Sequence, residues 1–99
     1  MQKLVKDFIS KYDLHTNEQI RYIDLVSEIG ELGKEIIKGV DYGKKEYKHT
    51  FDVSGELGDC LFSLIALCCE MNLDAQEVLQ QAMSKYEIRF ERKGSIGSE

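Results

Sequence analysis

A nearly continuous apolar segment, residues 57–69, is the feature that most constrains how this chain can fold. The chain contains no proline, so the segment is free to form a helix whose apolar side chains point in every direction. The apolar residues are Leu57, Cys60, Leu61, Phe62, Leu64, Ile65, Ala66, Leu67, Cys68 and Cys69. Such a helix is normally enclosed by protein. The run is shorter than the roughly 18–20 residues that a membrane span requires, which favours a core helix.

Helical periodicity recurs through the rest of the chain, whereas the alternating pattern of strands is missing. We predict an all-α fold with four helices, at about residues 2–12, 17–38, 51–71 and 74–92. Residues 40–50 are polar and contain glycine, which predicts a loop. The predicted organisation is a single helical domain over residues 1–93 with a flexible tail over 94–99.

Capping signals mark two of the predicted helix starts and two of the predicted ends. Thr16 precedes Gln19 by three residues, and Asp74 precedes Glu77 in the same way, which is capping-box spacing. Gly39 and Gly94 are the predicted helix ends.

Two carboxylates lie in or beside the apolar segment. Asp59 is inside it and Glu56 is one helical turn earlier, so the two share one stripe of the helix. An ionised carboxylate in such surroundings costs several kcal/mol (on the order of 3–5) unless something pairs with it. Its partner must be a basic side chain, a shared proton or a metal ion.

The preceding helix carries a second acidic stripe. Glu28 and Glu31 are three residues apart, and Glu35 follows one turn later as a candidate either for a further ligand or for a residue that supports the ligands from behind. Two helices joined by a loop of about eleven residues can pack antiparallel, which would bring both stripes together. Four converging carboxylates repel one another unless a divalent cation is bound. Oxygen ligands without His or Cys favour Mg²⁺, with Mn²⁺ also possible, over Zn²⁺.

A plainer interpretation of these acids stays open. Glutamates spaced along a helix commonly form a solvated face, and Glu56 near a helix start is favoured by the helix dipole. Asp59 fits neither explanation, because it lies within the apolar run.

The two acidic motifs, Glu28-Ile29-Gly30-Glu31 and Glu56-Leu57-Gly58-Asp59, resemble those of the MazG-like nucleotide pyrophosphohydrolases. The resemblance extends over about residues 20–90. It implies a four-helix bundle completed by homo-oligomerisation. It also implies hydrolysis of a nucleoside triphosphate to the monophosphate and pyrophosphate, with Glu28, Glu31, Glu56 and Asp59 as metal ligands and catalytic residues.

A basic segment near the C-terminus, residues 85–90, also resembles the family. Lys85 and Arg89 are four residues apart on one face of the predicted helix and would hold the distal phosphates of the substrate. The alternative is a surface ion-pair face with Glu87 and Glu91. The chain departs from many members at Ser27 and Gly55, where an additional acid is common, and at Ser63, where an aromatic residue is common.

Composition limits the partners. The chain of 99 residues has a net charge of −5, which argues against nucleic-acid binding because that requires a basic face. The N-terminal sequence has no signal-peptide pattern, and no segment has the length of a membrane span. The three cysteines lack metal-binding spacing and predict free thiols in a cytoplasmic protein.

A chain this short buries little core on its own, and the apolar helix needs cover. We therefore expect a homodimer or homotetramer in which a second chain covers Leu61, Phe62, Ile65, Cys68 and Cys69. Two other functions remain open. One is an all-α hydrolase of another pyrophosphate compound, such as phosphoribosyl-ATP. The other is a non-catalytic helical dimerisation module whose acidic stripe binds a cation or a basic partner.

Overall fold

The computed structural model describes residues 1–94, and its regular structure there is entirely helical. The helices are α1 (Gln2–Lys11), α2 (Glu18–Gly39), α3 (Val53–Glu70) and α4 (Ala75–Lys93). Each predicted helix is confirmed, with ends that differ by at most two residues from the prediction. Residues 95–99, which form most of the predicted tail, lie outside the described part of the chain.

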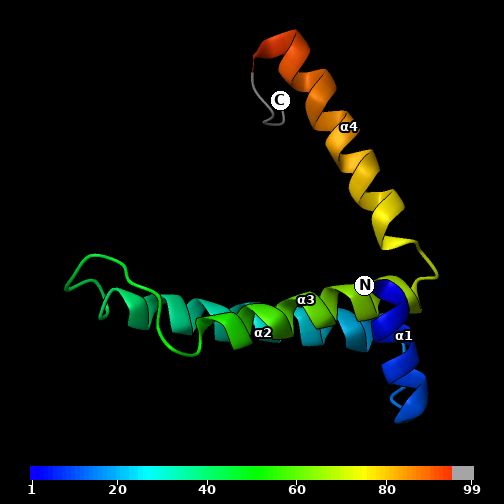
Figure 1. Ribbon diagram of the computed structural model, residues 1–99, viewed down its shortest axis with the longest axis horizontal. Coiled ribbons are helices and arrows are strands. Elements are labelled where there is room, and N and C mark those ends of the chain that lie inside the picture. Colours follow the sequence, from blue (N-terminus) through cyan, green and yellow to red (C-terminus); the bar gives the residue numbers. More distant parts are fainter. Residues whose placement is uncertain (95–99) are drawn as a thin grey trace.

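The helices form an open arrangement rather than a closed bundle. Helices α2 and α3 lie side by side and antiparallel, α1 packs near the C-terminal end of α3, and α4 projects away from the pair (Figure 1). The radius of gyration is 16.7 Å, whereas a compact domain of this length has about 13 Å. The protomer therefore does not close its own bundle.

The core is small and lies where α1 crosses α3. Val5 and Ile9 from α1 pack with Ile65 and Ala66 from α3, and Phe62 borders this cluster. Because α1 already leaves Ile65 only 5% exposed, the prediction that a second chain covers Ile65 is wrong. Phe62 is likewise packed within the protomer, where its ring meets the ring of Phe8 edge-on at 5.8 Å.

The rest of α3 is not enclosed by its own chain. Leu57, Leu61 and Leu64 remain 58%, 47% and 48% exposed, respectively. A helix that is apolar on all sides therefore has one side covered by α1 and α2 and another side open. The expected cover for Leu61 from a second chain stays a prediction.

The helix caps agree with the sequence at two places and differ at one. Asp74 accepts a hydrogen bond from the Glu77 amide at 3.0 Å, and Gly94 ends α4 in the left-handed conformation, as predicted. The predicted cap at Thr16 is wrong, because Asn17 has the extended backbone of a cap and its side chain accepts from the Ile20 amide at 2.9 Å. Within residues 1–94, no helix combines the length and the apolar character that crossing a bilayer requires.

A buried arginine fixes the far end of the α2–α3 pair. Arg21 is 7% exposed. Its side chain donates to the Leu14 carbonyl, and its Nε lies 3.4 Å from a carboxylate oxygen of Glu70 at the end of α3. This contact, at one end, and the loop over residues 40–52, at the other, hold the two helices in alignment, and the alignment decides which acidic residues meet between them.

Candidate metal centre

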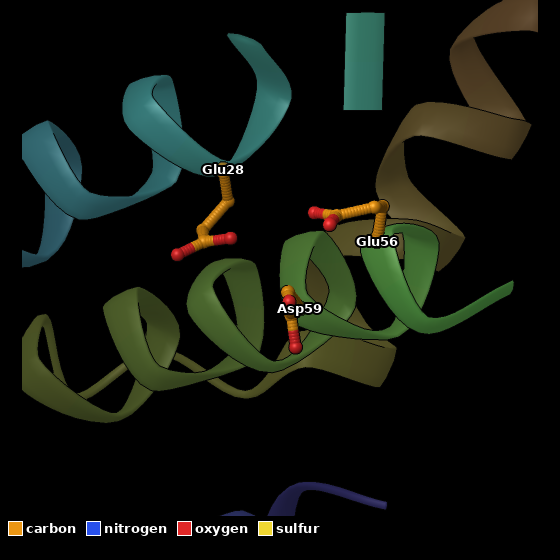
Figure 2. A group of neighbouring side chains, drawn as sticks. All are labelled: Glu28, Glu56 and Asp59. Atoms are coloured by element: carbon orange, nitrogen blue, oxygen red, sulfur yellow. The ribbon is translucent and has the colours of Figure 1, made fainter. Parts of the chain in front are cut away.

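The alignment of α2 and α3 brings together three of the four predicted acidic ligands. One carboxylate oxygen from each of Glu28, Glu56 and Asp59 lies within 4.8 Å of the other two. Figure 2 shows Glu28 projecting from α2 toward α3, on which Glu56 and Asp59 lie one turn apart. Glu28 and Glu56 are half-buried and Asp59 is exposed. The expected burial cost at Asp59 is therefore wrong for the single chain, because the apolar residues beside it, Leu57 and Leu61, are themselves largely uncovered. The three oxygens are close enough to share one cation.

The electrostatics of the cluster show charge repulsion. Partial burial raises the pKa of the Glu56 carboxyl, and the negative charges of Asp59, Glu31, Glu28 and Glu35 raise it further. Like charges at this spacing disfavour the ionised form. A divalent cation would relieve that repulsion, and an all-carboxylate donor set suits Mg²⁺ or Mn²⁺.

Glu31, the fourth predicted ligand, lies beside the cluster and not within it. Its side chain is 52% exposed, and a carboxylate oxygen lies 3.7 Å from the Lys34 ammonium. A surface pair of this kind contributes at most about 1 kcal/mol, so little holds Glu31 in this orientation. Its charge already acts on Glu56, which places the carboxylate within electrostatic range of the three others.

Glu35 lies one turn beyond Glu31 and is held by protein contacts. It is 6% exposed. One carboxylate oxygen accepts a hydrogen bond from the Thr50 hydroxyl, and the other lies 3.5 Å from the Lys38 ammonium. Sequence reasoning missed Thr50, because a single threonine in a polar loop carries no spacing signal that would pair it with a helix residue.

The backbone around the acidic residues is open. A methyl group added at Gly30, Gly33, Gly55 or Gly58 would meet no other atom within 4 Å. These glycines therefore do not serve close packing within the chain. They leave the surface beside the carboxylates accessible.

The two predicted phosphate-binding residues are not near the cluster in a single chain. Lys85 and Arg89 lie on α4, which projects away from α2 and α3 (Figure 1). The Lys85 ammonium lies 5.2 Å from the centre of the Tyr86 ring. No ion pair of Lys85 or Arg89 with Glu87 or Glu91 is found in the part of the chain that is described.

The chain is similar to known proteins over most of its length. Residues 16–92 match the family model described as the MazG nucleotide pyrophosphohydrolase domain. A curated protein, "Uncharacterized protein YpjD" of Bacillus subtilis (strain 168), is 34% identical over 68 residues. The aligned region covers 66% of this chain and 60% of that relative. No solved structure gives a significant match to the chain.

Proposed function

Because this chain belongs to the MazG nucleotide pyrophosphohydrolase family, we propose that it is a Mg²⁺-dependent nucleoside triphosphate pyrophosphohydrolase. The proposed reaction converts a ribo- or deoxyribonucleoside triphosphate and water to the monophosphate and pyrophosphate. The observation that carries the proposal is the convergence of Glu28, Glu56 and Asp59 from two helices. The matched region includes all three residues.

The acidic residues have separate tasks in this proposal. Glu28, Glu56 and Asp59 would hold the cation, which supplies charge neutralisation for the triphosphate and a water molecule of lowered pKa. Glu31 is free to turn toward the same site, either as a fourth ligand or to orient the attacking water. The water oxygen forms a bond to phosphorus, its proton passes to a carboxylate, and the bond between the α- and β-phosphates breaks. Such transfers depend mainly on positioning and charge stabilisation.

We assign the distal phosphates of the substrate to Lys85 and Arg89. Arginine offers a planar pair of donors that matches phosphate oxygens, and lysine adds a point charge. Since α4 projects away from its own acidic cluster, we propose that α4 of a second copy brings these residues to the site.

A homodimer or homotetramer is therefore part of the proposal. The exposed apolar side chains support it: Leu79, Met83 and Phe90 on α4 are 57%, 58% and 58% exposed. Complete burial of one such large apolar side chain against a second copy would stabilise the oligomer by roughly 1.5–3 kcal/mol. A monomeric mass in light scattering at micromolar concentration would contradict this part.

A cytoplasmic location also belongs to the proposal. The described cysteines, Cys60, Cys68 and Cys69, are all free thiols, which suits a reducing compartment.

The test is a pyrophosphate-release assay with ribo- and deoxyribonucleoside triphosphates in Mg²⁺. Asp59→Asn and Glu31→Gln are each expected to lower the rate by orders of magnitude while circular dichroism shows an unchanged helix content. Glu18→Gln, which removes an exposed acid at the start of α2, is the matched control and should keep wild-type turnover. Wild-type turnover in both Asp59→Asn and Glu31→Gln would refute the ligand assignment.

The same assay separates the alternative functions. Release of pyrophosphate only from phosphoribosyl-ATP would identify a related hydrolase with another substrate. Stabilisation by Mg²⁺ without turnover of any compound would identify a non-catalytic module that binds a cation.

A further inference from the structure

The loop between α2 and α3 is fastened to α2 at two places. The Lys48 amide donates to the Gly39 carbonyl at 2.9 Å, and the Tyr47 ring lies against Gly39. Two residues further on, the Thr50 hydroxyl donates to the Glu35 carboxylate. The chain is therefore attached to the side of α2 just before α3 begins.

The second attachment matters because the start of α3 has no side-chain cap of its own. Asp52 occupies the cap position, yet its side chain makes no capping hydrogen bond. Thr50 lies just ahead of Asp52, and Glu56 lies in the first turn that follows. The hydrogen bond from Thr50 to Glu35 is thus the nearest side-chain anchor for the turn that carries Glu56.

Glu35 itself is poorly suited to be a ligand. It is not one of the three carboxylates whose oxygens converge. Both of its oxygens are engaged, one by the Thr50 hydroxyl and the other by the Lys38 ammonium at 3.5 Å. Releasing a buried carboxylate from its hydrogen-bond donor is costly, because the lost contact is not replaced by water.

We infer that Glu35 is a positioning residue for the metal centre. By accepting a hydrogen bond from the Thr50 hydroxyl, Glu35 fixes the first turn of α3 and so holds the Glu56 carboxylate close to that of Glu28. Its task is to accept a hydrogen bond, which an uncharged amide oxygen also performs. A ligand, in contrast, needs the negative charge. This inference rests on the proposed function for its catalytic consequence, whereas the anchoring of α3 does not depend on any activity.

The experiment compares three variants by Mn²⁺ binding, read as the loss of the free-ion signal in electron paramagnetic resonance. Thr50→Val removes the donor and keeps the shape and the charge of Glu35. We expect it to weaken Mn²⁺ binding about tenfold, the size of one hydrogen bond to a charged group. Thr50→Ser restores the hydroxyl and should restore wild-type affinity. Glu35→Gln keeps an acceptor and should stay within about threefold of wild type.

Amide hydrogen exchange of Glu56 and Leu57, the first N–H groups of α3 with helical acceptors, is measured by NMR without metal and provides an independent test. We expect Thr50→Val to raise exchange there about tenfold while Thr50→Ser and Glu35→Gln leave it unchanged. Unchanged exchange in Thr50→Val would overturn the inference, whether or not the protein binds metal or hydrolyses a nucleotide.

The ligand interpretation of Glu35 predicts the opposite order of effects. If Glu35→Gln abolishes Mn²⁺ binding as fully as Asp59→Asn while Thr50→Val has no effect, Glu35 is a ligand and the inference is wrong. Failure of the proposed function is distinguishable. A protein that binds Mn²⁺ with the expected order of variants but releases no pyrophosphate would retain the positioning role and lose the reaction.

Discussion

Gly39, at the C-terminal end of α2, is the glycine whose replacement should be most costly. It is buried, and the loop returns directly over it. A β-carbon at this position would lie 2.6 Å from a ring carbon of Tyr47 and 2.7 Å from the Lys48 carbonyl oxygen. The tyrosine ring can turn aside, but the carbonyl belongs to the backbone. The loop must therefore move to accept even a methyl group.

The expected magnitude follows from two opposing effects. Alanine in place of glycine in a helix gains up to about 1 kcal/mol from helix propensity. Forcing an extra methyl into a filled space costs about 1–3 kcal/mol. With the full propensity gain, we expect Gly39→Ala to lower the free energy of unfolding by up to about 2 kcal/mol and the melting temperature by up to roughly 16 °C.

Gly33→Ala is the matched control, because a β-carbon there meets no atom within 4 Å. It should stabilise the protein by up to about 1 kcal/mol through helix propensity alone. Both variants are measured by urea unfolding followed by circular dichroism at one fixed protein concentration, since an oligomer makes stability concentration-dependent. A Gly39→Ala variant that is stabilised as much as Gly33→Ala would show that the loop does not rest on α2 as described.

Three further predictions concern charge. In EDTA, the free energy of unfolding should fall as the pH rises from 4.5, the ordinary pKa of a glutamate, through the raised pKa of Glu56 in the folded protein. The reason is that the folded state binds the Glu56 proton more tightly than the unfolded state does. Thermal melts of Glu56→Gln should lack this part of the pH dependence. Mg²⁺ at about a hundredfold above its dissociation constant should stabilise by about 2.7 kcal/mol in calorimetry, and Asp59→Asn should abolish this gain. Arg21→Met should lower the free energy of unfolding, measured in urea, by up to about 3 kcal/mol, because it leaves the largely buried Glu70 carboxylate without its partner. An unchanged free energy of unfolding would show that water takes the place of the arginine beside Glu70.

The helices were predictable because their signals are local. Periodicity placed all four, and the cap at Asp74 and the end at Gly94 followed from residue type and spacing. The N-terminal cap of α2 is Asn17 and not the predicted Thr16. Threonine and asparagine both cap helices well, and only the backbone conformation decides between two such neighbours.

The candidate site was predictable only in part. Spacing along α3 placed Glu56 beside Asp59, and antiparallel packing of the two consecutive helices predicted that Glu28 would meet them. The orientation of Glu31 toward Lys34 depends on a side-chain rotamer that no spacing specifies. The direction of α4 depends on a turn of a few residues and on what else packs there, so the distance of Lys85 from the cluster was beyond sequence reasoning.

The region around the carboxylates departs from what stability alone would favour. Asp59 adds a negative charge beside Glu28 and Glu56, partial burial and then the acidic neighbours raise the pKa of Glu56, and Gly30 and Gly58 lie in helices without any packing need within the chain. Each departure weakens the isolated protomer, because a helical glycine costs about 1 kcal/mol relative to alanine and clustered like charges repel. Natural sequences violate local rules of this kind mainly at functional sites. In the proposed function, a bound cation would offset the charge, and an approaching phosphate chain or second protomer would use the open backbone. The acidic residues that repel one another in the free chain are therefore the ones that the proposed metal site would use.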